Sequence, residues 1–476
     1  MAHRYGDRNS RSLFPISIEE YVSKDDPVRV YDAFVENLDF KELGIVKREG
    51  RVGAPCYDPA AMLKLFVYGY SYGLRSARKL ERACYHNVSF IWMVGGLKPD
   101  YKTISEFRRK NRKAIKKVLK QCARLCMKLG LIEGNILFLD SSKMRANASL
   151  GQFWTKERCE KYLKKLDEKI EKLLIECERI DKLEENCDSL VKVKEELLGK
   201  EKLQKKVKAV MKDLEETQLK SINSTDRDSV KSKSRQGSHA SYNTAIVTDG
   251  KHGLIVNNDS LSQSNDTNQF SNQIEQAEEV LEKESDVACS DAGFWQVEDL
   301  KKISSRGTKV VVPSKKQASQ KEIGEFEKEN FKYDKESDEY ICPEGKRLSF
   351  LRISKKNNCF EYRVKHAGEC LNCKNYGVCT KSKRGRIIAR LFNEDLKEEL
   401  EKIYESEEGR EIYKFRKQKV ELPFGHIKRN LGAGYFLLRG REGVNAEMSL
   451  LSTSFNISRM ITLLGVQFLL PMLLGT

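Results

Sequence analysis

Apolar side chains recur at steps of three and four along much of the first 130 residues, the spacing of amphipathic helices. Asp58-Pro59 predicts the start of one helix, because proline is well tolerated in a first helical turn. Ser76 can cap a second helix, and Thr103 or Ser105 can cap a third that runs into a lysine-rich stretch. The pattern predicts an all-helical domain over residues 1–130, in which short helices are separated by turns.

A short apolar run over residues 135–140 predicts a buried strand that ends in Asp140. Beyond it, residues 152–220 repeat apolar positions at steps of three and four, and most of the residues between them are Lys and Glu. This pattern predicts a helical hairpin or short coiled coil inserted after the strand. A structural arm or an oligomerisation element is the simplest role for such an insertion.

Strand-like patterns then alternate with helical ones. Residues 221–241 are rich in Ser, Lys, Arg and Gly, and they predict a flexible basic linker. Two β-rich runs around Asp249-Gly250 predict a hairpin, and its turn explains Asp249. A helix, a short strand leading to Asp291, a second helix and a strand over residues 308–313 follow. This order predicts a mixed α/β fold with one central sheet.

The last part of the chain combines a cysteine cluster with helices. Residues 394–430 predict one long charged helix, and residues 460–474 form an apolar run interrupted by Pro471. That run is shorter than the about 20 residues that a spanning helix needs, so we expect a buried terminal helix and no membrane anchor. The expected parts are a helical domain at 1–130, a first core segment at 131–338 with the insertion at 152–220, a Cys-rich insertion at 339–385, and the rest of the core with terminal helices at 386–476.

Charge points to the kind of partner. The formal net charge is +17, and residues 51–130 alone hold 18 Lys and Arg against 4 Asp and Glu. A field of this kind attracts the phosphates of DNA or RNA and makes binding sensitive to salt. The polar residues 1–12 lack the apolar run of a signal peptide, and the thirteen cysteines are scattered. We therefore expect reduced thiols and a cytoplasmic location.

Three acids occupy positions that suit metal chemistry. Asp140 and Asp291 each follow an apolar strand, where a charged carboxylate is unfavourable unless it is paired or bound to metal. Glu421 lies between Arg416 and Lys428, cations that can hold a phosphate. Carboxylates suit Mg²⁺, and two such ions can activate a nucleophile and stabilise the leaving oxygen of a phosphodiester. Strand-end aspartates also cap helices, so spacing alone leaves both interpretations open.

A second metal site is suggested by the cysteines of residues 339–385. Four thiolates can hold a tetrahedral structural zinc ion, and a CxxC pair supplies two of them at a workable spacing. The segment is short and polar, so a metal would help it fold. The expected ligands are Cys342, Cys370, Cys373 and Cys379. Cys359 and His366 are rival ligands, and reduced cysteines in a small β insertion are the alternative to zinc.

Several motifs carry a family resemblance. They are Asp140-Ser-Ser-Lys-Met-Arg-Ala-Asn-Ala-Ser149, Asp291-Ala-Gly-Phe, the string Tyr413, Arg416, Glu421 and Lys428, and the helical stretch from Pro59 to Arg109. Together they resemble the DDE transposases of bacterial insertion sequences, whose signature is Tyr-Arg-Glu-Lys. The resemblance covers most of residues 15–460. The usual signature has three residues between Arg and Glu, whereas this chain has four.

The resemblance implies an α/β, RNase H-like mixed central sheet with an inserted helical arm, preceded by an all-α DNA-binding domain. In that core Asp140, Asp291 and Glu421 would hold Mg²⁺ or Mn²⁺. It also implies binding of terminal inverted repeats, hydrolysis of a phosphodiester to free a 3′-OH, and attack of this hydroxyl on target DNA. The residues expected at DNA are Arg78, Arg108, Arg109, Lys143, Arg145, Tyr413, Arg416 and Lys428.

The expected assembly is a homo-oligomer on DNA in a bacterial cytoplasm, associated with the nucleoid. A structure-specific nuclease without strand transfer is one alternative function. A transposase-derived protein that binds DNA without cutting it is another, although the three intact acids speak against it.

Overall fold

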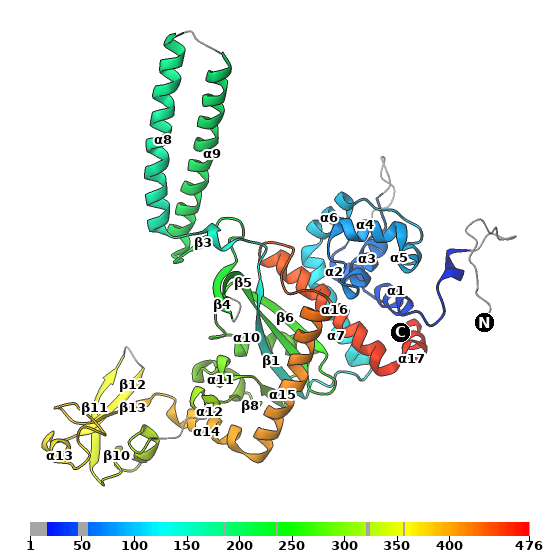
Figure 1. Ribbon diagram of the computed structural model, residues 1–476. Helices are drawn as coiled ribbons and strands as arrows, with labels where there is room; N and C mark the ends of the chain where they lie inside the picture. The colour runs from blue at the N-terminus through cyan, green and yellow to red at the C-terminus, as the bar shows by residue number, and fades with distance from the viewer. Residues whose placement is uncertain are drawn as a thin grey trace, which may run out of the picture. The chain divides into compact units, whose positions relative to one another are not determined.

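The computed structural model describes residues 17–45, 56–183, 187–234, 237–319, 324–355 and 358–475 (Figure 1). Their contacts divide the chain into two compact units. The first unit comprises the residues up to 266 together with 273–284 and 417–476, and the second comprises 267–272 and 285–416. The boundary between Arg416 and Lys417 falls inside one helix.

The described N-terminal residues are helical, as their periodicity predicts. After a 3-10 turn, η1 (Ile18–Tyr21), the helices are α1 (Val28–Glu36), α2 (Phe40–Leu43), α3 (Pro59–Ser71), α4 (Ala77–His86), α5 (Val88–Met93), α6 (Tyr101–Lys110) and α7 (Arg112–Lys128). Helix α3 is the centre of this group, because it packs against α1, α4 and α5 and is buried over most of its length. Gly69 permits that packing, since a Cβ there would lie 2.2 Å from Leu80 Cδ2.

Helix caps test the predicted boundaries. The carboxylate of Asp58 accepts from the backbone N–H groups of Ala60 and Ala61, which confirms the predicted start of α3. Ser76 occupies the N-cap position of α4 but makes no side-chain capping bond. The prediction of Thr103 or Ser105 as a cap is wrong. Asp100 caps α6, because its carboxylate accepts from Lys102 N–H and Thr103 N–H and the helix therefore begins earlier.

The strands of the first unit gather around β5 (Gly237–Asp249). It pairs antiparallel with β1 (Ile136–Arg145), β4 (Val230–Ser234) and β6 (Ile255–Leu261). The β5–β6 hairpin is confirmed, and Asp249 closes it by accepting from Gly134 N–H at 2.8 Å and Lys251 N–H at 2.9 Å.

The prediction of a flexible linker over residues 221–241 is wrong. This segment contains β3 (Ile222–Asn223), β4 and the start of β5. In β4, Ser232 is buried while Lys231 and Lys233 are exposed, so a two-residue alternation was present in the sequence. Pairing with β5 stabilises a strand whose composition alone is typical of a loop.

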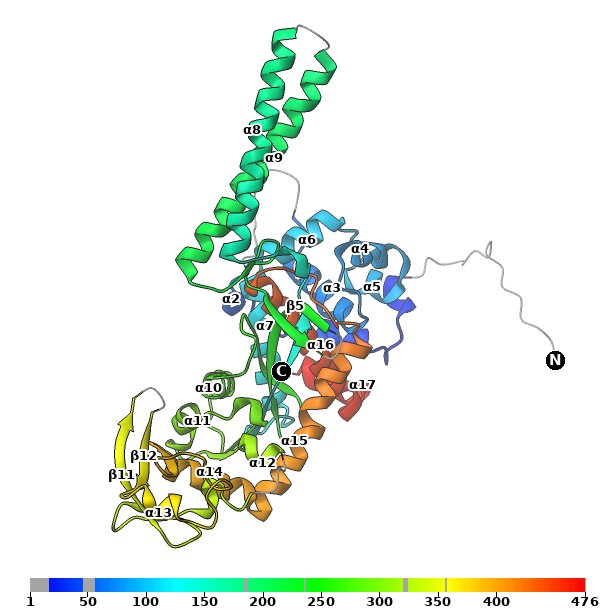
Figure 2. The same cartoon turned by 60° about the vertical axis from the view of Figure 1, so that its left-hand side comes forward.

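The predicted helical arm is confirmed. Helices α8 (Lys156–Leu183) and α9 (Cys187–Thr217) run side by side in both views (Figures 1 and 2). At their base, after a 3-10 turn, η2 (Leu150–Gln152), the short strand β2 (Phe153–Trp154) pairs with β3. A small separate core lies there, formed by Trp154, Cys159, Val207, Val210, Leu214 and Ile222. The arm therefore has a hydrophobic core of its own, and the paired strands β2 and β3 join its two ends.

The first unit ends in helices. Helix α16 (Arg441–Leu464) is buried along most of its length and packs against α3, α7 and β6. The terminal helix α17 (Val466–Leu474) buries Leu469 and Leu473 but exposes Phe468. Among the described helices, none is by itself long and apolar enough to cross a membrane, although α16 and α17 pass such a test jointly across a 115° bend.

The second unit contains two sets of strands. Strands β7 (Val287–Cys289) and β8 (Lys309–Val311) are parallel and are joined through η3 (Ala292–Phe294) and α11 (Val297–Ser304). A five-stranded antiparallel sheet follows in the order β13-β12-β11-β10-β9. Its strands are β9 (Lys332–Asp334), β10 (Glu339–Ile341), β11 (Arg347–Ser354), β12 (Cys359–Val364) and β13 (Ile387–Leu391).

The remaining elements correct one further prediction. They are α10 (Phe270–Leu281), α12 (Lys315–Ser319), η4 (Lys328–Asn330), α13 (Gly368–Leu371), α14 (Glu394–Glu405), α15 (Glu407–Gly425) and a π-helical turn, η5 (His426–Asn430). Residues 394–430 are therefore not one helix. Ser406 breaks it, because its backbone is extended and its hydroxyl accepts from Gly409 N–H at 3.0 Å to start α15.

The chain is thus a mixed α/β protein with N-terminal helices. The order strand, hairpin, helix, strand, helix, strand is confirmed by β1, β5–β6, α10, β7, α11 and β8. Both antiparallel and parallel strand pairs occur.

Candidate functional site

Asp140 lies in the middle of β1, and the prediction that it ends a strand is wrong. The ladder with β5 continues to Arg145, which pairs with Ser241, and this keeps the polar second half of β1 extended. The Asp140 side chain is half-buried, and its Oδ1 accepts from the backbone N–H of Ser141 at 2.9 Å. The acid is therefore presented by a regular strand.

Lys428 lies beside Asp140 within the first unit. Its ammonium donates a hydrogen bond to the hydroxyl of Ser142, which is two positions beyond Asp140 on β1 and on the same face. Burial lowers the pKa of Lys428 below its ordinary value, and the nearby Asp140 carboxylate opposes this shift. Ser142 did not stand out in the sequence, although its two-residue spacing from Asp140 was the signal that could have identified it.

Glu421 occupies the exposed side of α15, near the end of that helix. The helix continues past Pro423 to Gly425 and is followed by the π-helical turn that contains Lys428. A π turn has more residues than an α turn. Glu421 and Lys428 are therefore not separated by two regular α-helical turns.

In the second unit, Asp291 belongs to a cluster with two residues of the Tyr-Arg-Glu-Lys string. Asp291 follows β7 and caps η3 by accepting from Gly293 N–H at 2.9 Å. The buried guanidinium of Arg416 lies 5.3 Å from the centre of the Tyr413 ring. Burial raises the pKa of Cys289 to about 12, an effect that Arg416 opposes and Asp291 adds to. Arg416 and Asp291 therefore both lie close to Cys289.

The basic residues of the helical domain differ in exposure. Arg78 is exposed, and its guanidinium lies 4.9 Å from the centre of the Tyr101 ring. Arg109 is also exposed and forms an ion pair with Glu106 at 2.7 Å. Arg108 is only 7% exposed. Of the three arginines of the helical domain that are expected at DNA, Arg78 and Arg109 are therefore accessible.

The guanidinium of Arg108 has protein partners. It donates to the hydroxyl of Tyr70 at 3.2 Å and to the carbonyl of Arg75 at 2.9 Å. Because these bonds lie in the core, Arg108 is placed as a structural residue, and the expected DNA contact is not favoured by its position.

Lys143 and Arg145 are exposed on β1. Successive residues of a strand point to opposite faces, so both lie on the face opposite Asp140 and Ser142. Arg145 is 3.2 Å from the ring nitrogen Nε2 of His239. The two basic residues form a surface separate from the Asp140 face.

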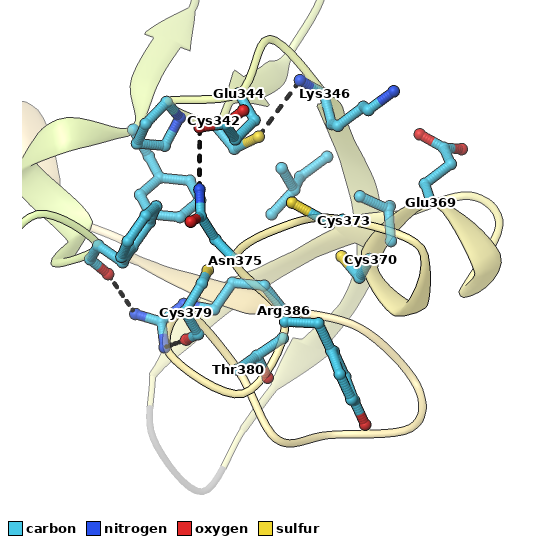
Figure 3. Close-up of a pocket in the computed structure, with 16 residues that line it drawn as sticks. Cys342, Glu344, Lys346, Glu369, Cys370, Cys373, Asn375, Cys379, Thr380 and Arg386 are labelled. Carbon is cyan, nitrogen blue, oxygen red and sulfur yellow. Dashed lines mark hydrogen bonds between the residues drawn. The ribbon is translucent and has the colours of Figure 1, made fainter.

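The structure gathers the four expected zinc ligands around one small cavity of about 30 Å³ (Figure 3). Its lining includes Cys342, Cys370, Cys373 and Cys379, whereas the rivals Cys359 and His366 do not line it. Burial raises the pKa of Cys379, and the three other thiols add to that shift.

Metal binding itself stays a prediction. Within the described ranges, no three His, Cys, Asp or Glu side chains form a group tight enough to hold a metal ion. Neither the acid triad nor the zinc set is therefore assigned as a metal centre by the geometry alone.

Comparison with known families adds independent information. The family model described as a transposase domain (DUF772) matches residues 16–110, and the model described as a transposase DDE domain matches residues 341–461. The second match includes the four cysteines that line the cavity and the whole Tyr413 to Lys428 string. No curated protein and no solved structure matches the chain. The two matches, in the order that the resemblance implies, support a DDE transposase of an insertion sequence.

Proposed function

We propose that this transposase binds the terminal inverted repeats of its element, hydrolyses a phosphodiester to free a 3′-OH, and joins that end to target DNA. One observation carries the proposal. In each unit a cation of the signature lies in the neighbourhood of one of the acids: Lys428 with Asp140, and Arg416 with Asp291. A phosphate-handling site needs both charges, because acids bind metal and fixed cations bind the DNA backbone.

The proposed catalytic core is RNase H-like, with Asp140, Asp291 and Glu421 as ligands of Mg²⁺ or Mn²⁺. The donor chemistry fits, since all three are carboxylates and hard divalent cations prefer oxygen ligands. Magnesium bound there would supply positive charge to the attacking and leaving oxygens of the phosphodiester. The family match supports this core, because DDE transposases generally use divalent metal ions.

The chain's own residues would position the DNA. Lys428, held by Ser142, would contact a phosphate beside Asp140. Arg416 and Tyr413 would do the same beside Asp291. The exposed Arg78 and Arg109 would bind phosphates of the terminal repeat, and Lys143 and Arg145 would contact DNA on the other face of β1. Mostly phosphate contacts make this binding weaken steeply with salt.

The domain organisation follows the same proposal. Residues 1–130 would bind the element's ends, and residues 131–338 and 386–476 would form the catalytic core, with the arm at 152–220 and the Cys-rich insertion at 339–385. The active form would be a homo-oligomer assembled on DNA, in a bacterial cytoplasm and associated with the nucleoid.

The test compares amide variants in two assays. Asp140→Asn, Asp291→Asn and Glu421→Gln should each abolish cleavage of a labelled terminal-repeat duplex in Mg²⁺, because the amide loses the negative charge that holds the metal. Binding of the same duplex in a gel-shift assay should remain. Glu411→Gln, which changes another exposed acid of α15, is the matched control and should cut normally.

Two outcomes would overturn parts of the proposal. Cleavage by Glu421→Gln at the parental rate would remove Glu421 from the triad. Cleavage of the duplex without any joined product in the presence of target DNA would favour a nuclease that lacks strand transfer.

A further inference from the structure

The long loop between β12 and β13 has little apolar packing of its own. The core of the five-stranded sheet consists of Phe331, Tyr340, Leu348, Tyr362, Val364 and Ile388, none of which belongs to the loop. Within the loop, α13 has only four residues, and Val378 is 78% exposed. The loop side chains that do pack against the core include Cys370 and Cys379. Something other than a hydrophobic core must therefore stabilise this segment.

The four thiols around the cavity come from two separate segments. Cys342 lies in the tight turn between β10 and β11, where its Sγ accepts from the backbone N–H of Lys346 at 3.2 Å. Gly345 makes that turn possible with a φ of +74°. This bond fixes the orientation of the Cys342 sulfur within the turn.

The other three thiols lie on the β12–β13 loop. Backbone bonds fold that loop, from Cys373 N–H to the Cys370 carbonyl at 3.2 Å and from Cys379 N–H to the Asn375 carbonyl at 2.9 Å. Figure 3 shows the four cysteine side chains around the same cavity. The sulfurs thus approach from two sides.

Polar contacts hold the two segments against each other. Asn375 Nδ2 donates to Glu344 Oε1 at 2.9 Å, and Lys374 forms an ion pair with the same carboxylate at 3.2 Å. These contacts place the β10–β11 turn opposite the CxxC pair. The register of the two segments is therefore set by protein contacts outside the sulfur cluster.

The backbone beside the thiols is closely packed at Gly385. A Cβ on Gly385 would lie 2.9 Å from Val364 Cγ2 and 3.3 Å from Cys370 Sγ, and its φ is +90°. Arg386 supports the loop from the other side by donating to the Cys379 carbonyl at 3.2 Å. A side chain at position 385 would push against the cluster, so glycine keeps the space for sulfur.

We propose that Cys342, Cys370, Cys373 and Cys379 hold one structural zinc ion that fastens the β12–β13 loop to the β10–β11 turn. Four sulfur donors are the preferred set for a closed, tetrahedral zinc site, and the binding energy replaces the missing apolar core.

The structure also separates the ligands from their rivals. Cys359 is the first residue of β12, at the opposite end of that strand from Val364, and it pairs with Leu391 of β13. Cys359 does not line the cavity. His366 is exposed and also lies outside the lining.

The experiment uses full-length reduced protein purified without chelators. Metal analysis should find about one zinc per chain. Replacement of zinc by Co²⁺ should produce thiolate-to-cobalt charge transfer and the strong visible bands of a tetrahedral site. Cys373→Ser should lose the zinc and expose the β12–β13 loop to protease, whereas the matched variants Cys359→Ala and His366→Ala should retain one zinc per chain.

Cys373→His keeps a zinc ligand and should retain the ion with weaker charge transfer, which separates loss of a ligand from general misfolding. Two results would overturn the proposal: reduced wild-type protein that contains no zinc and takes up neither zinc nor cobalt, or zinc loss in Cys359→Ala or His366→Ala equal to that in Cys373→Ser. None of these measurements needs DNA, so they succeed or fail independently of strand transfer.

Discussion

The ammonium of Lys428 donates a hydrogen bond to the hydroxyl of Ser142, although the two residues are 286 positions apart in the sequence. This bond brings the turn after α15 to strand β1 and places the last residue of the Tyr-Arg-Glu-Lys string beside Asp140. Burial lowers the pKa of Lys428, so the cation is held there at an energetic disadvantage. A charge kept in an unfavourable place is typical of a functional position.

Replacing Lys428 by Met should stabilise the folded protein but slow DNA cleavage. The folded-state pKa of Lys428 lies below its unfolded value of about 10.4, so the buried cation destabilises the fold at neutral pH. Stability should rise as the pH increases through the folded pKa toward that value. Lys428→Met should raise the thermal midpoint at neutral pH and remove this rise, while loss of a charge-assisted contact should slow cleavage by about 10- to 100-fold.

Thermal unfolding across pH, beside the duplex cleavage assay, checks this prediction. Arg429→Met alters an exposed cation of the same turn and should leave the midpoint nearly unchanged. A lower midpoint for Lys428→Met at neutral pH would show that the ammonium stabilises the fold instead.

Arg108 and Arg109 should respond differently to truncation. Arg109→Ala should weaken binding to the terminal repeat and reduce the slope of log affinity against log salt by about 1, as expected for one lost phosphate contact. Arg108→Ala should leave the slope unchanged and lower the free energy of unfolding by about 1–3 kcal/mol, because Tyr70 and the Arg75 carbonyl lose a buried partner. Salt titrations and denaturant melts measure the two effects. Equal salt slopes for the two variants would contradict the assignment.

Arg75 and Glu447 form a buried ion pair at 2.9 Å between the α3–α4 turn and α16. Removing one partner should leave an uncompensated charge, so Glu447→Ala should lower the free energy of unfolding by about 3–5 kcal/mol. The double variant Arg75→Met with Glu447→Leu should recover part of that loss. Chemical denaturation provides the measurement. An unchanged midpoint for Glu447→Ala would mean that the pair contributes nothing to the fold.

The arm should be removable without unfolding the rest of the first unit. Trp154 and Ile222 pair at its base, so a short Gly-Ser linker can replace residues 156–217. Circular dichroism should show less helix but a preserved cooperative melt. If the arm is an oligomerisation element, the mass of the complex on terminal-repeat DNA should fall to that of one chain. An unchanged mass would assign the arm a purely structural role.

Features that depend on neighbouring residues could be predicted from the sequence alone. The periodicity of α8 and α9, the Asp58 cap of α3 and the Asp249 turn each depend on residues a few positions apart, and the structure confirms them. The order of strands and helices in the central part followed for the same reason. The chemistry of the possible metal ligands could also be predicted from nearby residues, because a CxxC pair places two sulfur donors at a spacing that suits a metal ion.

Contacts between distant segments could not be predicted in this way, because they depend on the three-dimensional fold. Composition marked the β4 segment as a linker, yet pairing with β5 makes it a strand. Adjacent arginines with the same charge became one core residue and one surface residue, because helix α6 turns Arg108 toward Tyr70 and Arg109 toward solvent. Lys428 contacts Ser142, and the cavity is lined by Cys342 but not by Cys359. These contacts join segments whose separation in sequence carries no information about their separation in space.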